Sequence, residues 1–212
     1  MEYTWVYISG ILVLAYLLGS IPFSLWIGLI FFHTDIRREG SGNAGTTNTF
    51  RVLGWKAGIP VFMLDVMKGW IAVNLAQLLP DGSIPKEFQI YLAISLAICV
   101  VIGHIRPIFA GFKGGKGVAT LLGIGIALYP VSGPAAFGVF LIVFPLSGYV
   151  SLSSILACIS FPFLSYFLCN NTETPLVVLS VAVAVFVPLT HLKNIKRLLA
   201  GTESRFLYKS KK

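Results

Sequence analysis

No charged residue occurs between Val118 and Cys169, and this uncharged stretch constrains the fold more than any other feature. A helix needs about 20 predominantly apolar residues to cross a bilayer. Proline and glycine interrupt helices, and they cluster within this stretch at residues 129–134 and 145–149. We therefore predict three short membrane spans between Val118 and Cys169.

Apolar runs elsewhere predict four more spans, at residues 6–32, 59–79, 88–110 and 175–188. The first run is not a secretory signal peptide, because Glu2 gives it an acidic flank and it lacks a small-residue cleavage site. At residues 19–22 it is interrupted, and Pro22 must kink or break the helix there. Hydrophobic residues make up 56% of the 212 residues and charged residues only 11%, against roughly 25% charged in soluble domains. We expect an all-α integral membrane protein with seven transmembrane helices, forming a single transmembrane domain over residues 1–212.

The distribution of the basic residues predicts the orientation of these helices. Most of the 16 Lys and Arg residues lie in three segments, the loop after the first span, the loop after the third span and the C-terminal tail. Loops rich in Lys and Arg stay on the cytoplasmic side of a membrane. Seven helices with the N-terminus outside and the C-terminus inside place all three segments in the cytoplasm.

Two charged side chains, Asp65 and Lys68, fall inside an expected span. An isolated charge in a membrane helix is costly, but residues three apart on a helix face one another and can pair. We expect a bundle-interior ion pair, and keep direct contact with a bound anion as the alternative.

Two glycine-rich loops with basic residues are the candidate functional segments. Residues 111–117 read Gly-Phe-Lys-Gly-Gly-Lys-Gly, and residues 40–48 are similarly rich in glycine and small polar residues and are followed by Arg51. Little side-chain bulk leaves backbone N–H groups open, and ammonium groups beside them suit a phosphate. The sequence therefore indicates a membrane protein that handles phosphate anions.

Several better-known motifs are excluded. Gly40, Gly42 and Gly45 have the spacing of a dinucleotide fingerprint, but no buried strand precedes them. Gly117 stands where a Walker A motif needs Ser or Thr, and no Gly-x-Ser-x-Gly elbow is present. The three cysteines lie in apolar segments without a Cys-x-x-Cys pair. We therefore expect no metal site, no cofactor and no nucleic-acid partner.

The motifs together resemble the bacterial acyl-phosphate-dependent glycerol-3-phosphate acyltransferases. The matching segments occur in the family's order over nearly the whole chain: residues 18–23, 40–48, 51, 64–65, 68–69, 103–104, 107, 109, 112–120, 149–152, 191, 194–199 and 201–203. The resemblance implies a multi-pass enzyme of the bacterial cytoplasmic (inner) membrane. It implies transfer of a fatty acyl group from acyl phosphate to the 1-hydroxyl of sn-glycerol 3-phosphate, giving lysophosphatidic acid and phosphate. Acyl phosphate, glycerol 3-phosphate, the bilayer and the enzyme that makes acyl phosphate are the partners it implies.

The resemblance also assigns site residues. Lys116, Ser41 and His104 are expected to be catalytic, with Lys116 at the phosphate or the developing oxyanion. The expected substrate-binding residues are Arg51, Asn43, Thr46, Asn48, Lys113, Gly114, Gly115, Gly117, Ser151, His191 and Asn194. Most of these residues have a structural alternative: an interfacial lysine, a lipid-anchoring arginine, a loop-capping side chain, a backbone-shaping glycine or a structural histidine. Since the sequence shows no carboxylate placed to orient either histidine, we expect a substrate phosphate to assist proton removal.

Two other classes of function remain as alternatives at this point. Broken helices and cationic loops also occur in anion carriers, so a transporter or channel for phosphate esters is the main one. A scaffold that binds anionic lipid would account for the basic tail but not for the glycine loops. Only the acyltransferase consumes acyl phosphate.

Overall fold

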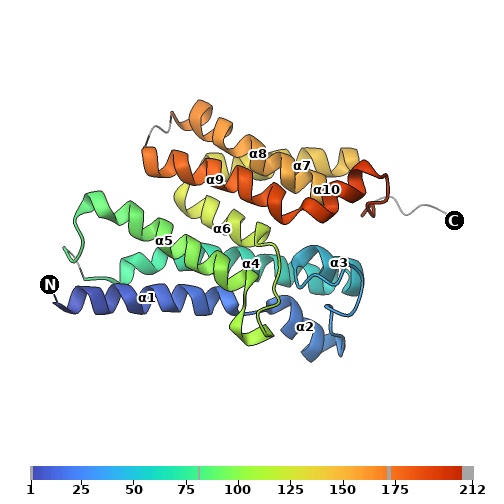
Figure 1. Cartoon of the computed structure of the whole chain (residues 1–212), viewed down its shortest axis with the longest axis horizontal. Coiled ribbons are helices and arrows are strands. Elements are labelled where there is room, and N and C mark those ends of the chain that lie inside the picture. Colours follow the sequence, from blue (N-terminus) through green and yellow to red (C-terminus); the bar gives the residue numbers. More distant parts are fainter. Residues whose placement is uncertain (1, 81, 171–172, 207–212) are drawn as a thin grey trace. The chain divides into compact units, whose positions relative to one another are not determined.

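The computed structural model describes residues 2–80, 82–170 and 173–206, which form helices and connecting loops without a strand. The chain divides into two compact units, Met1–Leu128 and Tyr129–Lys212. Figure 1 shows the helices of both. The expected all-α fold is confirmed for these residues, and each unit is described in turn below.

Unit 1 contains six α-helices and two short 3₁₀ turns among its described residues. The helices are α1 (Glu2–Ser20), α2 (Phe23–Phe32), α3 (Thr46–Leu53), α4 (Trp55–Asn74), α5 (Lys86–Ile105) and α6 (Val118–Leu128). The turns are η1 (Leu75–Leu78) and η2 (Ile108–Ala110). The two glycine-rich loops therefore connect α2 to α3 and η2 to α6.

The first apolar run is broken where the sequence predicted. Helix α1 ends at Ser20 and α2 begins at Phe23, and the two axes differ by 43°. Pro22 has no N–H to donate, so the backbone cannot continue the helical bonding across it. The break leaves the carbonyl of Ile21 available, and Lys68 of α4 donates to it at 3.1 Å.

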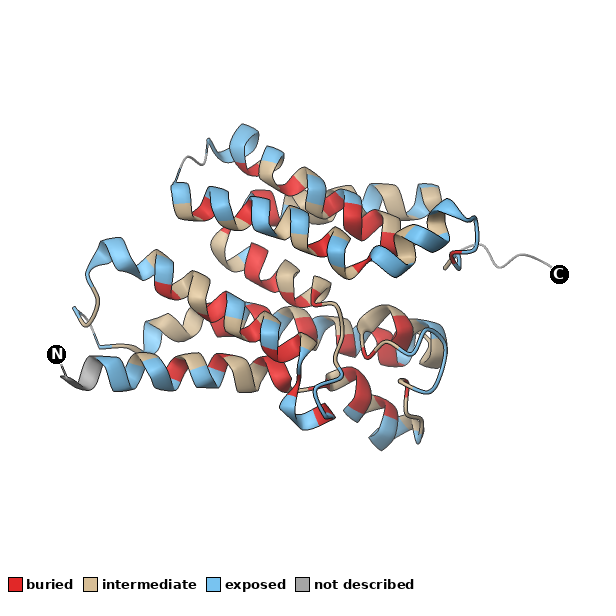
Figure 2. Cartoon of the chain, in the orientation of Figure 1, coloured by how far each residue is buried: buried red, intermediate tan, exposed pale blue. Residues whose placement is uncertain are grey.

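Close helix crossings form the core of unit 1. Helix α1 packs along α5, and α4 packs along α6. A Cβ added at Gly69 of α4 would overlap the Thr120 carbonyl, and one added at Gly123 of α6 would overlap the Val66 carbonyl. Small residues allow such backbone approach between membrane helices. Figure 2 shows buried residues where α1, α4 and α5 meet, and the core cluster includes Ala15, Ala72, Leu96 and Val100.

Unit 2 consists of α7 (Ser132–Ser147), α8 (Val150–Cys169), α9 (Thr174–Thr190) and α10 (Leu192–Leu199). Helix α8 packs against both α7 and α9. The chain turns sharply after Thr190, so that α10 departs from α9 by 62°. The uncharged stretch from Val118 to Cys169 thus forms α6, α7 and α8, with breaks at the two predicted places.

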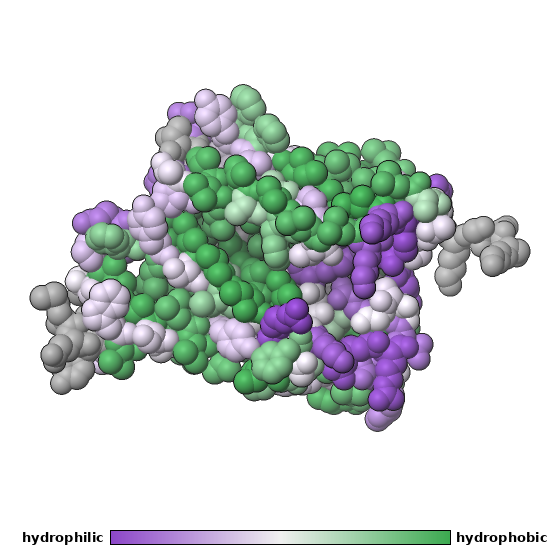
Figure 3. Space-filling view, viewed as in Figure 1, coloured by the Kyte–Doolittle hydropathy of each residue, from purple (hydrophilic) through white to green (hydrophobic). Residues whose placement is uncertain are grey.

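Among the described residues, three helical segments are long and apolar enough to cross a membrane, and the number rises to five if each bent pair counts as one span. Helices α6 and α7 are apolar but shorter than a full crossing. Figure 3 shows wide apolar areas on the surface of both units. Large apolar side chains such as Phe31, Ile142 and Phe167 are exposed to the surroundings. Helices with apolar surfaces of this kind are suited to a lipid environment.

Candidate active site

The two glycine-rich loops meet in unit 1, as the sequence analysis required of a shared site. A Cβ added at Gly45 would lie 4.0 Å from the Cα of Gly115, and one added at Gly115 would lie 3.0 Å from the Ala44 carbonyl. The guanidinium of Arg37, just before the first loop, donates to the carbonyl of Ala110 at 3.3 Å. The structure therefore brings loops more than 60 residues apart in the sequence to one place.

The second loop lies against the C-terminal end of α5. The N–H of Gly114 donates to the carbonyl of Ile105 and that of Gly115 to the carbonyl of His104, both at 3.2 Å. The expectation of open amides is therefore wrong for these two glycines. They are needed as glycines because a side chain on Gly114 would overlap the His104 carbonyl. The first turn of α6, which follows the loop, has backbone amides without intrahelical acceptors.

The first loop is held by Asn48, which is 1% exposed. Its side-chain oxygen accepts from the N–H of Ser41 at 2.9 Å and from the Ser41 hydroxyl at 3.1 Å. Its amide nitrogen donates to the carbonyls of Ile36 and Glu39. These bonds support a loop-shaping role for Asn48. Contact of Asn48 with substrate stays a prediction.

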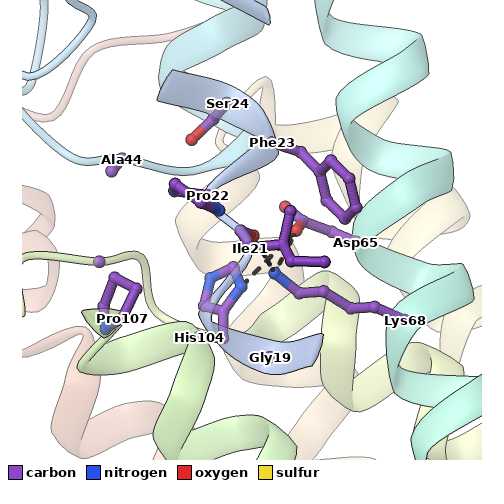
Figure 4. A pocket seen from close by; sticks show the side chains of 11 residues that line it. Gly19, Ile21, Pro22, Phe23, Ser24, Ala44, Asp65, Lys68, His104 and Pro107 are labelled. Carbon is purple, nitrogen blue, oxygen red and sulfur yellow. Dashed lines mark hydrogen bonds and ion pairs between the residues drawn. The ribbon is translucent and has the colours of Figure 1, made fainter. Parts of the chain in front are cut away.

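A buried ionic cluster lies beside the two loops (Figure 4). The expected pair is present: Lys68 Nζ lies 2.8 Å from Asp65 Oδ1, and both side chains are at most 3% exposed. The hydroxyl of Thr46, at the start of α3, donates to Asp65 Oδ2 at 3.4 Å. The pair therefore connects α4 to the first loop, as well as to the carbonyl of Ile21 at the α1–α2 break.

His104 completes this cluster from α5. Its Nδ1 lies 3.6 Å from Asp65 Oδ1 and 3.2 Å from the hydroxyl of Thr120. The prediction that no carboxylate is placed to orient a histidine is therefore wrong for His104. The two residues are separated by 39 positions and lie on different helices, so no local spacing could reveal the contact. The opposite edge of the ring faces Gly115, where an added Cβ would overlap Nε2.

The three expected cations of unit 1 differ in their exposure. Arg51 is exposed in the last turn of α3, and Lys113 is exposed in the second loop. Lys116 is half-buried two residues before α6 begins. Gly117, between Lys116 and α6, has a φ of +80°. Because glycine adopts this conformation without strain, it lets the chain turn from the loop into the helix. Asn43 lies in the first loop beside Gly45.

A second polar cluster lies in unit 2 around the carboxylate of Glu203. Oε1 accepts from Ser151 at 2.8 Å and from Asn194 at 2.6 Å, and Oε2 accepts from Arg197 at 2.6 Å. Burial alone raises the pKa of this carboxyl, but the three donors outweigh burial and hold the pKa of Glu203 below its usual value. The predicted residues Ser151 and Asn194 are thus joined by one carboxylate from the C-terminal segment.

His191 lies at the junction of α9 and α10 and is 4% exposed. Its Nδ1 is 2.8 Å from the carbonyl of Val187. Since a carbonyl oxygen only accepts, Nδ1 carries a proton. The ring orientation is therefore fixed by the last turn of α9.

Sequence reasoning did not assign a role to three residues that organise these clusters. Thr120 and Glu203 stood within the matched motifs, and both proved to be buried polar partners of predicted site residues. Arg205 lay outside the motifs, yet its Nε donates to the Tyr149 hydroxyl at 3.1 Å. Thr120 and Glu203 stand out in the structure because they are buried polar side chains, and this burial cannot be predicted from local sequence spacing.

Comparison with known proteins identifies the family of this helical membrane protein, which has two glycine-rich loops and a buried ionic cluster. The family model described as glycerol-3-phosphate acyltransferase matches residues 9–201. A protein named glycerol-3-phosphate acyltransferase from Chlorobaculum tepidum is 42% identical, with 94% of this chain and 96% of that protein covered. One of the same name from Chlorobium luteolum is 39% identical over equal shares. The chain belongs to the glycerol-3-phosphate acyltransferase family.

Solved structures agree with this assignment. A crystal structure of PlsY, an integral membrane glycerol 3-phosphate acyltransferase, in its glycerol 3-phosphate form matches with a TM-score of 0.82 and 37% identity. The match covers 94% of this chain and 95% of that one. The lysophosphatidic acid form of PlsY matches with a TM-score of 0.80 and 36% identity. The resemblance drawn from the motifs is therefore confirmed at the level of the family and its multi-pass membrane fold.

Proposed function

We propose that this protein transfers a fatty acyl group from acyl phosphate to the 1-hydroxyl of sn-glycerol 3-phosphate, releasing lysophosphatidic acid and inorganic phosphate. The observation that carries the proposal is the junction of two glycine-rich loops, with Arg51, Lys113 and Lys116 on the same loops or next to them. Both reactants carry a phosphate, so a site with cations on two converging loops suits them. Membership of the family supports the acceptor substrate.

The chemistry needs little beyond positioning and charge neutralisation. An acyl phosphate is a mixed anhydride, and its phosphate leaves readily once its negative charge is neutralised. Holding two reactants in line and placing donors at the developing oxyanion supply most of the rate in such reactions. Lys116 takes the oxyanion or the leaving phosphate in this scheme, and Arg51 grips the phosphate of glycerol 3-phosphate bidentately.

The remaining site residues have supporting roles in the proposal. Ser41 and His104 act with Lys116 at the reacting groups. The proposed substrate-binding set is Arg51, Asn43, Thr46, Asn48, Lys113, Gly114, Gly115, Gly117, Ser151, His191 and Asn194. For Gly114 and Gly115 the contribution is the path of the backbone, since their amides are bonded to α5. The family model covers both units, which supports including residues of unit 2 and treating residues 1–212 as one catalytic domain.

The proposal includes seven crossings of the bacterial cytoplasmic membrane, with the N-terminus outside. Helix pair α1–α2 and helices α4 to α9 supply the crossings. Within unit 1, the bond from Arg37 to Ala110 supports a common face for the two basic loops. Within unit 2, the bonds of Glu203 to Ser151 and of Phe206 N–H to the Gly148 carbonyl support a common face for the α7–α8 loop and the C-terminal segment. The acyl phosphate comes from a separate enzyme.

The test is a reconstituted assay with purified protein in phospholipid vesicles. Palmitoyl phosphate and glycerol 3-phosphate should give lysophosphatidic acid without added metal or nucleotide. Product formation that requires palmitoyl-CoA would overturn the choice of donor. Uptake of radiolabelled glycerol 3-phosphate into sealed vesicles, with no product formed, would instead identify a transporter.

A further inference from the structure

The short helix α10 has an outer face made of two adjacent strips. Residues three, four and seven apart on a helix lie on the same side. Leu192 and Leu199 form an apolar strip, and they are 51% and 85% exposed. Lys193 and Lys196 form a basic strip, which is also exposed. Because Leu192 and Lys196 are one turn apart, the strips lie next to each other, and a partner for this face must be both apolar and anionic.

The direction of α10 suits a position at a membrane surface. Helix α9 has 17 residues, which makes it about 25 Å long and close to the thickness of the hydrocarbon core, about 30 Å. Helix α10 follows after one residue and departs from the axis of α9 by 62°. When α9 crosses the bilayer, its C-terminal end lies near a membrane surface. The bend then turns α10 toward the plane of that surface.

The carboxylates of unit 2 do not neutralise the basic strip. Glu173 directly precedes α9, at the end of that helix opposite to α10. Glu203 accepts from three donors, and its ion pair is with Arg197. Within the described part of unit 2, these are the two acidic residues, and neither forms an ion pair with Lys193 or Lys196. The strip therefore carries positive charge that is complementary to an anionic partner.

The headgroup layer of an anionic bilayer matches both strips. Anionic lipids attract basic residues beside a membrane helix, and an interfacial helix places its apolar side chains at the boundary with the acyl chains. A soluble acidic protein would meet the lysines but would leave the strip with Leu199 facing water. A second copy of this chain, placed symmetrically, would bring like charges together at the basic strip.

We propose, on the basis of the crossing proposed for α9 and independently of the reaction, that α10 is an interfacial helix that binds anionic phospholipid headgroups. Lys193 and Lys196 contact the headgroup phosphates, and Leu192 and Leu199 enter the boundary with the acyl chains. Arg197 of the same helix holds Glu203. Helix α10 thus connects the headgroup layer to the polar cluster of unit 2.

The first measurement is the depth of the two strips. The full chain, with its three cysteines replaced by alanine, carries Leu199→Cys or Lys193→Cys and a bimane label, and is reconstituted in vesicles of phosphatidylcholine and phosphatidylglycerol. We expect the label at 199 to be quenched by a lipid with a nitroxide on its acyl chain. The label at 193 should be quenched more strongly by aqueous iodide than the label at 199.

The second measurement is the preference for anionic lipid, read from the label at 199 in phosphatidylcholine vesicles. Nitroxide-labelled phosphatidylglycerol is compared with nitroxide-labelled phosphatidylcholine. A lysine near an anionic surface contributes on the order of fivefold in binding, so half-maximal quenching should need at least about fivefold less of the anionic lipid. Lys193→Gln/Lys196→Gln should reduce this preference to within about twofold. Lys56→Gln/Lys86→Gln is the matched control, because it removes two exposed lysines from unit 1.

Thermal unfolding shows which variants are folded, and salt provides a test that needs no lysine variant. The preference should shrink as the salt concentration rises, because salt screens charges at a surface. Equal quenching by the two lipids, or an unchanged preference in the folded double variant, would overturn the proposal. A label at 199 that iodide reaches and the lipid nitroxide does not would place α10 in water. Shielding of this label from both quenchers would show a protein partner on α10, and either result overturns the proposal. Synthesis of lysophosphatidic acid is measured separately, so its failure overturns the proposed function alone.

Discussion

At the scale of single residues, the loop cations and the buried cluster have different tasks. Arg51 and Lys113 are exposed and Lys116 is half-buried, so all three can meet a soluble, anionic substrate. Asp65, Lys68 and Thr120 are almost completely buried and act on the neighbouring backbone and on His104. In the proposed function, the outer residues bind the substrate phosphates and the inner ones fix the geometry of the site.

Removing a loop cation should therefore reduce turnover without unfolding the protein. Losing one charge-assisted contact to phosphate costs on the order of 1.5 to 3 kcal/mol, or roughly ten- to a hundredfold in rate. We expect Lys116→Ala and Arg51→Ala to lose at least that much in kcat/KM while their thermal unfolding stays unchanged. Lys56→Ala is the matched control, because Lys56 is exposed and lies outside both loops. Wild-type kinetics in either loop variant would show that the replaced cation does not contact substrate.

Glu203 should stabilise the fold in a pH-dependent way. Its pKa is lowered in the folded protein by the donors Arg197, Asn194 and Ser151. A carboxyl with a lowered folded pKa adds stability above its unfolded value of about 4.3, and this stability is lost as the pH falls through the folded pKa. Glu203→Gln should lower the melting temperature at pH 7, by an amount reflecting about 1.5–3 kcal/mol for a charged hydrogen bond. The gap to wild type should narrow below about pH 4, whereas Glu39→Gln should show little change at either pH.

At the scale of helices, glycine positions decide how closely the elements pack. Gly69 and Gly123 let α4 and α6 cross with backbone contact, which places Thr120 beside His104. The α1–α2 break supplies the carbonyl that Lys68 needs. The site is therefore a product of helix packing as much as of the loops.

A bulky residue at this crossing should disturb both stability and activity. Overpacking a core costs typically about 1–3 kcal/mol. Gly123→Leu should therefore lower the melting temperature and the turnover, because its side chain would meet the Val66 carbonyl. Gly138→Leu serves as the control, since an added Cβ at this position of α7 meets nothing within 4 Å. Equal melting temperatures for the two variants would contradict the close crossing of α4 and α6.

The elements were more predictable than the site. The breaks after Ser20, at 129–131 and at 148–149 follow from proline and glycine, whose effect on a helix is local. The pairing of Asp65 with Lys68 follows from helical spacing. The contact of Asp65 with His104 and the bonds of Gly114 and Gly115 to α5 depend on how distant segments fold back. Such contacts are properties of packing, which sequence spacing does not contain.

At the scale of the whole molecule, the proposed orientation assigns each loop either to the cytoplasmic side or to the outer side of the membrane. The exposed positions Ser41, Lys113 and Lys196 belong to the basic segments, whereas Lys86 and Thr174 are the exposed first residues of α5 and α9. Basic segments remain in the cytoplasm. The four proposed crossings between the second loop and the tail, α6 to α9, make this arrangement self-consistent.

Cysteine labelling tests the orientation directly. Single cysteines at Ser41, Lys113 and Lys196, in a chain with Cys99, Cys158 and Cys169 replaced by alanine, should react with an impermeant maleimide only from the cytoplasmic side. Cysteines at Lys86 and Thr174 should react only from outside. Labelling of Lys196 from outside would contradict the seven crossings, and thermal unfolding of each single-cysteine variant shows whether its fold is preserved.

The most direct test of the central claim is the balance between the two products. Purified protein should release inorganic phosphate from palmitoyl phosphate only when glycerol 3-phosphate is present, and phosphate and lysophosphatidic acid should form in equal amounts. This result is expected because the acyl group moves directly between two phosphate-bearing reactants. Phosphate released without glycerol 3-phosphate, or lysophosphatidic acid formed without release of phosphate, would contradict acyl transfer from acyl phosphate at this site.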